Sequence, residues 1–177
     1  MRILCFMIPL FMVGACKSPS HTTVSSENTK TIKSMEKQYD CPKDGTCEVK
    51  IYENKSLEFV DDGSGVAYAE KVDGNNLVIE YTYYRKGPEG TADGNYFETV
   101  QFEIPTTTKS LKKEGNSLAD VNMIFSKFGF RNAAAYQVKK GNLSLQKAGK
   151  EISFNLNFKV DGSGQVLNEV AAKAILD

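Results

Sequence analysis

The chain has 177 residues, with 22 basic and 22 acidic side chains, one histidine, four cysteines and no tryptophan. This length is sufficient for one ordinary domain with its own hydrophobic core. The formal net charge of zero excludes the strongly basic footprint of a nucleic-acid-binding protein, so nucleic acid is not an expected partner.

Residues 1–15 are predicted to be a signal peptide. One basic residue, Arg2, precedes an apolar run at 3–13, and two small residues follow the run. The run is shorter than the roughly 20 residues that a membrane-spanning helix needs, but it has the length of the apolar region of a signal peptide.

The sequence Val-Gly-Ala-Cys at 13–16 resembles the lipobox of bacterial lipoproteins. The resemblance implies that Cys16 receives a diacylglycerol and becomes the new N-terminus. Two or three acyl chains hold a protein stably on a membrane, whereas one chain binds only marginally. Lys17 stands where an aspartate would retain such a lipoprotein in the inner membrane, so the expected location is the outer membrane. Ordinary secretion, with Cys16 as a free thiol, is the alternative.

Residues 16–40 are predicted to be a flexible tether. They are rich in Ser, Thr, Lys and Asn and have few large apolar side chains, so they bury too little surface to offset their ordering entropy. Flexible-coil scaling gives a root-mean-square span of about 25–30 Å. A short helix around 32–37 is only weakly encoded.

Cys41 and Cys47 are predicted to form a structural disulfide. Cys5 leaves with the signal peptide and Cys16 is the anchor, so these two remain as a pair. Closing so short a loop would stabilise the fold by roughly 2 kcal/mol. A redox-active pair is more typically Cys-x-x-Cys, and a metal site needs more ligands than two thiols.

From residue 47 onward apolar and polar side chains alternate, which predicts half-buried strands. The expected strands are 49–52, 57–60, 66–71, 77–83, 100–104, 135–139, 143–146 and 152–160. Turn residues separate them at 62–63, 73–75, 140–142, 148–149 and 161–162. This pattern predicts that 41–177 is a single, mainly β domain, either an antiparallel sandwich or a barrel, with one or two short helices.

Two segments have helical spacing instead. In residues 118–128, apolar side chains recur at spacings of three and four residues, Ser117 can cap the N-terminus of a helix and Gly129 can end it. At the C-terminus, 166–175 has the same spacing and is rich in alanine, so a helix is slightly favoured over a closing strand at 166–172.

The residues that catalysis usually requires are mostly missing. His21, the only histidine, lies in the tether, which excludes Ser-His-Asp and Cys-His nucleophile systems and histidine-bound zinc in the domain. The Asp-Gly segments at 61–65 and 161–164 do not have the spacing of a calcium loop. Neither a phosphate loop nor a dinucleotide fingerprint is present. We therefore expect no cofactor, no metal and no catalytic residues.

Three glutamates lie on expected strands, namely Glu80, Glu98 and Glu103. A pair of carboxylates in a cleft could hydrolyse a glycosidic bond, so a hydrolase that uses only carboxylates is one alternative function. The sequence instead predicts that these glutamates form a solvated sheet face.

Tyr84 is the strongest candidate for an exposed binding aromatic. Tyr81 and Tyr83 are expected on the core side of their strand, whereas Tyr84 points the other way. Tyr84 also lies beside the longest expected hairpin connection, residues 85–94, which could carry recognition.

The cysteine pair, the turn near Gly63 and the segment Asp-Gly-Asn-Tyr-Phe-Glu at 93–98 resemble small uncharacterised lipoproteins of flavobacterial type. This resemblance implies an envelope location and no known activity.

Ser-Gly-Val-Ala-Tyr at 64–68 and Lys-Gly at 86–87 resemble segments of membrane-bound inhibitors of C-type lysozyme. In that family the serine loop enters the enzyme cleft and the lysine contacts acidic groups, so the resemblance implies binding roles for Ser64, Tyr68 and Lys86. This chain differs from the family in its cysteine arrangement and in having Tyr84-Arg85 where the family has tryptophan.

The expected function is that of a non-enzymatic binding or assembly module tethered to the bacterial cell envelope. Its expected contacts are the membrane, through acyl chains on Cys16, and an envelope protein or glycan. Inhibition of a lysozyme-type cell-wall hydrolase and carboxylate-only hydrolysis are the alternatives.

Overall fold

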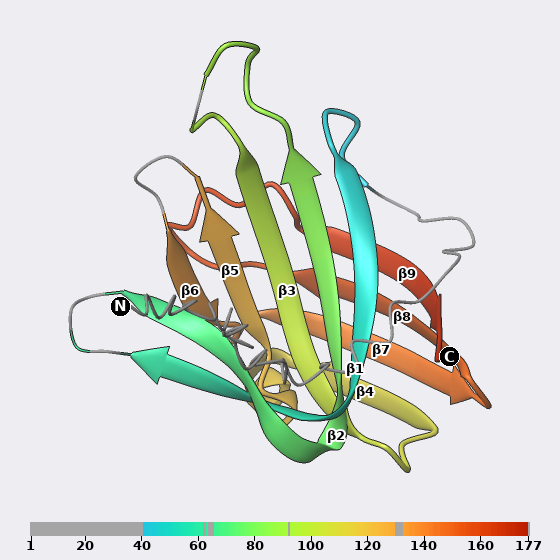
Figure 1. The fold of residues 1–177 in the computed structure, drawn as a ribbon. Helices are drawn as coiled ribbons and strands as arrows, with labels where there is room; N and C mark the ends of the chain where they lie inside the picture. Colours follow the sequence, from blue (N-terminus) through green and yellow to red (C-terminus); the bar gives the residue numbers. More distant parts are fainter. Residues whose placement is uncertain (1–40, 62, 64–65, 92, 130–132, 177) are drawn as a thin grey trace, which may run out of the picture.

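The computed structural model describes residues 41–61, 63, 66–91, 93–129 and 133–176. The predicted signal peptide, the predicted lipidation site Cys16, the predicted tether and Ser64 lie outside the described residues. The described chain forms two antiparallel sheets packed face to face (Figure 1), which confirms the mainly β, sandwich-like fold. No described helix is long and apolar enough to cross a membrane.

The five-stranded sheet has the order β1-β2-β3-β5-β6, and the four-stranded sheet has the order β4-β7-β8-β9. The described elements are β1 (Thr46–Asp61), β2 (Ala67–Arg85), β3 (Tyr96–Pro105), β4 (Ser110–Glu114), the 3₁₀ helix η1 (Gly115–Val121), β5 (Ile124–Phe128), β6 (Ala134–Gln137), β7 (Gly141–Ala148), β8 (Glu151–Phe158) and β9 (Glu169–Ile175). At one edge of the sandwich, β1 lies against β9.

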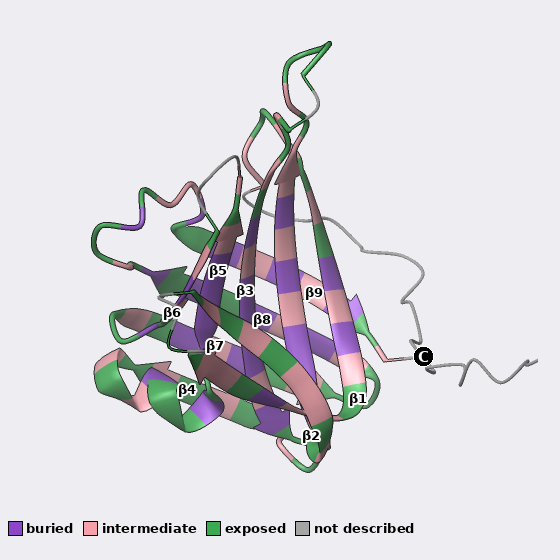
Figure 2. Ribbon diagram, turned by 60° about the vertical axis from the view of Figure 1, so that its left-hand side comes forward, coloured by how far each residue is buried: buried purple, intermediate pink, exposed green. Residues whose placement is uncertain are grey.

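The core lies between the two sheets. Alternate residues of each strand point inward, which produces the buried bands along the strands in Figure 2. Phe102 of β3 meets Phe154 of β8 edge-on, with ring centroids 5.3 Å apart, and Phe125 meets Phe158 at 5.6 Å. Aromatic contacts across the interface therefore hold the sheets together.

The β1–β2 hairpin is longer than the sequence pattern predicts, because four expected strands merge into two. The expected turn at 73–75 lies inside β2 and forms a bulge, in which Lys55 is aligned with both Asp73 and Asn76. Asn54 has a positive φ of 56°, and a Cβ on Gly74 would lie 2.2 Å from Ser56 Oγ. A bulge of this kind bends both strands sharply.

The bend folds the end of the hairpin, residues 56–61 and 67–72, across the outer face of the five-stranded sheet (Figure 1). We call this part the outer hairpin. Its Leu57 is 3 % exposed and packs with three residues of the sheet below, Val78, Ile124 and Ala135. The Leu57 backbone N–H also donates to Glu103 Oε2 at 2.9 Å. The outer hairpin thus makes a second, smaller apolar cluster on the face opposite the core.

The predicted helix at 118–128 is wrong over most of its length. A 3₁₀ helix ends at Val121, and Asn122 takes a left-handed conformation with φ 45° well before Gly129. The following residues form β5, where Ile124 and Phe125 face opposite sides of the sheet and are both buried. Burial on both faces makes a strand resemble an amphipathic helix in sequence.

The slightly favoured helix at the C-terminus is also wrong. The alternative of a closing strand is confirmed, although β9 spans Glu169–Ile175 rather than 166–172. Val170, Ala172 and Ala174 are buried with a period of two, and Ala172 lies opposite Phe154 of β8. The free edge of β8 provides a backbone ladder for this segment, and small side chains fit beside the large ring. Tertiary pairing therefore overrides the helical preference of alanine.

We predict that Leu57→Ala lowers the free energy of unfolding by about 2–4 kcal/mol, because it leaves a cavity under the outer hairpin. Glu58→Ala is the matched control, since the exposed Glu58 side chain should change stability by less than about 0.5 kcal/mol. Urea denaturation measures both. Equal effects would mean that the outer hairpin does not pack on the sheet in solution.

Candidate functional site

The candidate site is the end of the sandwich where β1 and β3 begin and β2 and β5 end (Figure 1). The segment 41–47, the β2–β3 loop at 86–95 and the connection between β8 and β9 lie at this end. A polar network lies on the inner side of the sheet, and a row of aromatic side chains lies on its outer face.

The segment 41–47 is closed by the predicted disulfide between Cys41 and Cys47, whose Cα atoms are 5.9 Å apart. The segment contains Asp44, which accepts a hydrogen bond from the Tyr83 hydroxyl at 2.9 Å and forms an ion pair with Arg85 at 3.1 Å. The hydrogen bond from Tyr83, as the largest cause, and the contact with Arg85 lower the pKa of Asp44 below its ordinary value. Burial is the main cause that raises the pKa of Tyr83.

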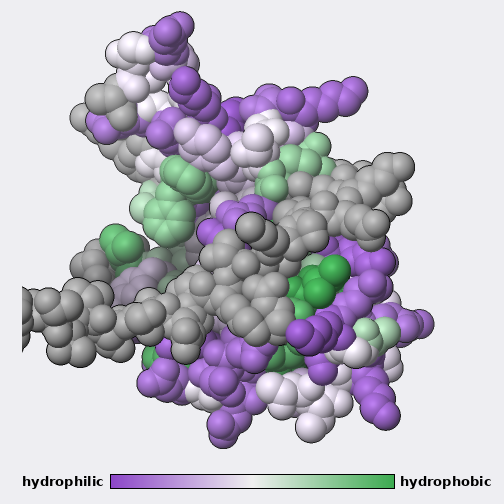
Figure 3. Space-filling view, turned by 45° about the vertical axis from the view of Figure 1, so that its right-hand side comes forward, coloured by the Kyte–Doolittle hydropathy of each residue, from purple (hydrophilic) through white to green (hydrophobic). Residues whose placement is uncertain are grey.

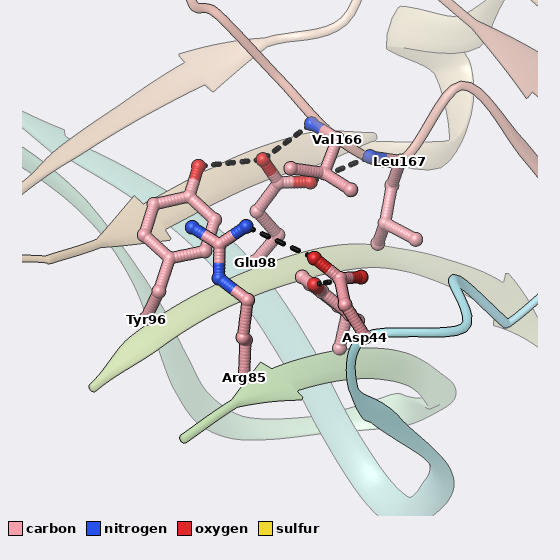
Figure 4. A network of polar contacts seen from close by, with 7 residues as sticks. Asp44, Arg85, Tyr96, Glu98, Val166 and Leu167 are labelled. Carbon is pink, nitrogen blue, oxygen red and sulfur yellow. Dashed lines mark hydrogen bonds and ion pairs between the residues drawn. The ribbon is translucent and has the colours of Figure 1, made fainter. Parts of the chain in front are cut away.

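Glu98 is the centre of the network and is completely buried. Its carboxylate accepts hydrogen bonds from the Tyr96 hydroxyl at 2.6 Å, from the Val166 backbone N–H at 2.6 Å and from the Leu167 backbone N–H at 2.7 Å (Figure 4). Glu98 therefore fastens β3 of one sheet to the connection between β8 and β9 of the other. The prediction of a solvated face is wrong for Glu98, which lies on the core side of β3 beside Val100.

Arg85 and Tyr96 connect the two parts of this network. The Arg85 guanidinium lies 5.1 Å from the centroid of the Tyr96 ring and makes a cation–π contact with it. The same guanidinium forms the ion pair with Asp44 (Figure 4). Burial, followed by the hydrogen bond to Glu98, raises the pKa of the Tyr96 hydroxyl. The segment 41–47 is thus linked through side chains to Glu98.

Glu80 and Glu103, on the outer face, are also engaged rather than solvated. Glu80 accepts hydrogen bonds from three side chains, those of Tyr52, Lys71 and Gln101. Glu103 accepts from the Leu57 backbone and from the Asn122 amide. The predicted solvated face is wrong here because the outer hairpin covers this part of the sheet.

On the outer face, Tyr84, Phe97 and Phe128 are aligned across β2, β3 and β5. We call these three residues the aromatic row. The rings of Tyr84 and Phe97 are 4.8 Å apart, and Phe97 and Phe128 are 37 % and 45 % exposed. Figure 3 shows hydrophobic surface beneath the projecting, hydrophilic β2–β3 loop.

Asn95 fixes the β2–β3 loop to the aromatic row. Its side-chain oxygen accepts hydrogen bonds from the Tyr84 hydroxyl at 3.2 Å and from the Gly87 backbone N–H at 3.1 Å. Gly87 and Gly94 pack closely at the base of the loop, where a Cβ on Gly87 would lie 2.4 Å from the Gly94 Cα. The loop base therefore holds the Tyr84 ring in place.

The described residues for which the sequence predicts a binding role lie in two separate regions of the structure. Tyr84 points to the outer face, opposite in direction to the buried Tyr81 and Tyr83, as its position in the strand predicts, but it is half-buried against Phe97 rather than exposed. Lys86 is exposed at the start of the loop. Tyr68 is 40 % exposed on the outer hairpin. No described hydrogen bond or ring contact joins Tyr68 to Tyr84 or Lys86.

Sequence reasoning missed Phe97 and Phe128. Phe97 belongs to the segment 93–98, from which the sequence predicts only a family resemblance, and Phe128 lies in the wrongly predicted helix at 118–128. Each ring lies near the end of a strand and alternates with the core side chains of that strand, and this position in the sequence indicates an outward-facing aromatic residue. Within the described ranges, no group of three His, Cys, Asp or Glu side chains is arranged to hold a metal ion.

We predict that Glu98→Gln lowers the free energy of unfolding by about 2–4 kcal/mol. The amide nitrogen would face a buried N–H or O–H donor, leaving both without an acceptor. The control is Glu89→Gln in the β2–β3 loop, where the side chain is exposed. Urea denaturation at neutral pH compares the two variants. A Glu98→Gln protein as stable as the control would contradict the network.

The Asp44 contacts predict a specific pH dependence. Because the pKa of Asp44 is lower in the folded state, its contribution to stability is present above the unfolded value of about 4 and is lost as the pH falls through the folded value. Wild type should therefore be more stable than Asp44→Asn near pH 7, and the difference should narrow below about pH 4. Thermal unfolding of both proteins between pH 7 and pH 2 measures this, and a constant difference would contradict it.

No protein-family model matches the chain, and no curated protein or solved structure is significantly similar to it.

Proposed function

We propose that the chain is a lipoprotein of the bacterial cell envelope whose β domain is a non-enzymatic binding or assembly module. Acyl chains on Cys16 would hold it at the outer membrane. The lipobox resemblance and the composition of 16–40 support the anchor and the tether. The disulfide between Cys41 and Cys47 supports an oxidising compartment, such as the periplasm or the cell surface.

The observation that carries the binding role is the aromatic row. Large apolar side chains that gather at the surface mark interaction sites more often than isolated ones do, and aromatic residues dominate binding energies. Tyr84 and Phe97 stand on strands paired on both sides, and Asn95 restrains the Tyr84 ring. A platform held in this way loses little conformational entropy when it binds.

The engagement of the carboxylates supports a non-enzymatic role over a hydrolase. A general acid or base must reach a proton of the substrate. Glu98 is buried with three protein donors, and Glu80 and Glu103 accept bonds from neighbouring groups. These groups are therefore occupied in holding the fold together.

The proposal is tested with the full chain, carrying a C-terminal affinity tag, in a double-membrane bacterial host. Cells are fed a clickable palmitate analogue, which should label wild type but not Cys16→Ser. An unlabelled wild-type protein would contradict the anchor.

The same cells are then cross-linked, and envelope components retained by the tagged chain are identified. We expect at least one component, protein or glycan, whose retention is lost in Phe97→Thr/Phe128→Thr and kept in Ile175→Thr. Ile175 is a matched control because it is as exposed as Phe97 but lies on β9 of the other sheet, outside the aromatic row. Retention that is identical in all three proteins would contradict a binding role for the row.

A further inference from the structure

A row of hydroxyl side chains lies beside the aromatic row on the same outer face. Thr82, Thr99 and Ser126 are aligned across β2, β3 and β5, two residues along each strand from the aromatic rings. The two rows are therefore separated by roughly 7 Å. Farther along the face, the outer hairpin covers the sheet around Ile124 and Val78.

These hydroxyl groups have no hydrogen-bond partner among the described residues. Within the same part of the chain, every fully buried side-chain oxygen or nitrogen has a partner. The hydroxyl oxygens of Thr82, Thr99 and Ser126 are therefore not completely buried, although Ser126 as a whole is only 4 % exposed. Thr82 and Thr99 are half-buried, so their hydroxyl groups are the more accessible to a ligand, to which a hydroxyl can donate or from which it can accept.

The chemistry of the two rows excludes several kinds of ligand. Neither row contains a charged side chain on β2, β3 or β5. On the same face, Glu48 and Lys50 of β1 lie opposite Thr82 and Glu80 and pair with each other at 3.1 Å, so this cation is balanced by a carboxylate and does not favour a phosphate group or an anionic membrane surface. A peptide that adds as a strand needs an unpaired sheet edge, whereas β2, β3 and β5 each have neighbours on both sides. A suitable ligand is uncharged and must have both an apolar face and hydroxyl groups.

We propose that the aromatic row and its hydroxyl neighbours bind a neutral oligosaccharide. A pyranose ring presents C–H groups on its faces, which pack on aromatic rings, and hydroxyl groups around its rim, which match those of Thr82, Thr99 and Ser126. The aromatic row spans two inter-strand spacings, about 10 Å, a length comparable with a disaccharide unit. This inference rests on the proposed binding function and assigns its ligand class.

The test is isothermal titration of the full chain, in a detergent without a sugar head group, with cellohexaose, maltohexaose and chitohexaose. We expect at least one of them to bind with a Kd in the micromolar to millimolar range. Phe97→Thr and Phe128→Thr should each weaken binding about tenfold, and threonine retains the strand preference at these positions. Thr99→Val, which removes a hydroxyl at nearly constant shape, should weaken binding about three- to tenfold.

Ile175→Thr is the control and should bind as wild type does, because Ile175 is as exposed as Phe97, at 37 %, but lies on β9 of the four-stranded sheet, away from the aromatic row. Each variant is accepted only if its thermal unfolding is cooperative. Absence of binding to all three probes at about 10 mM, or binding unchanged in Phe97→Thr and Phe128→Thr, would overturn the proposal. An envelope protein retained through the aromatic row without any saccharide binding would overturn the oligosaccharide while leaving the proposed binding function intact.

Discussion

The bend in the β1–β2 hairpin determines which part of the five-stranded sheet meets solvent. Because Asn54 takes a left-handed conformation and Gly74 lies against Ser56, both strands turn and cross the outer face instead of continuing straight. The outer hairpin then buries an apolar cluster on one part of this face. The strand ends carrying the aromatic row lie beyond the outer hairpin, and two of its rings are exposed. Covered and uncovered regions of a single sheet face thus follow from one local irregularity.

The uncovered end of the sheet is held by polar contacts on its inner side. Glu98 binds the connection between β8 and β9, while Asp44, within the disulfide-closed segment, binds Tyr83 and Arg85. A buried carboxylate is tolerated because backbone and side-chain donors satisfy it. These contacts belong to the residues that alternate with Tyr84 and Phe97, so the interior of the strand ends is fixed while the outer side chains stay accessible. A rigid support of this kind suits recognition by surface aromatics.

Much of the fold is predictable from the sequence, and the errors have a common cause. The strand at 152–160, the position of the disulfide and the directions of Tyr81, Tyr83 and Tyr84 depend on local alternation and on cysteine number. The helix at 118–128, the C-terminal helix and the turn at 73–75 fail because each depends on a distant partner. At 73–75 the Gly-containing segment forms a bulge, since the strand continues and pairs with β1 on both sides of it.

The sequence by itself determines that the domain is mainly β and that its cysteines can close a small loop, since these features depend on periodicity and residue type alone. The tertiary structure decides which polar side chains are buried and which aromatic side chains are exposed. Glu98 and Phe97 are adjacent in sequence, yet one is buried among donors from another sheet and the other faces solvent. A strand exposes its two sides to different surroundings, and those surroundings come from segments more than sixty residues away.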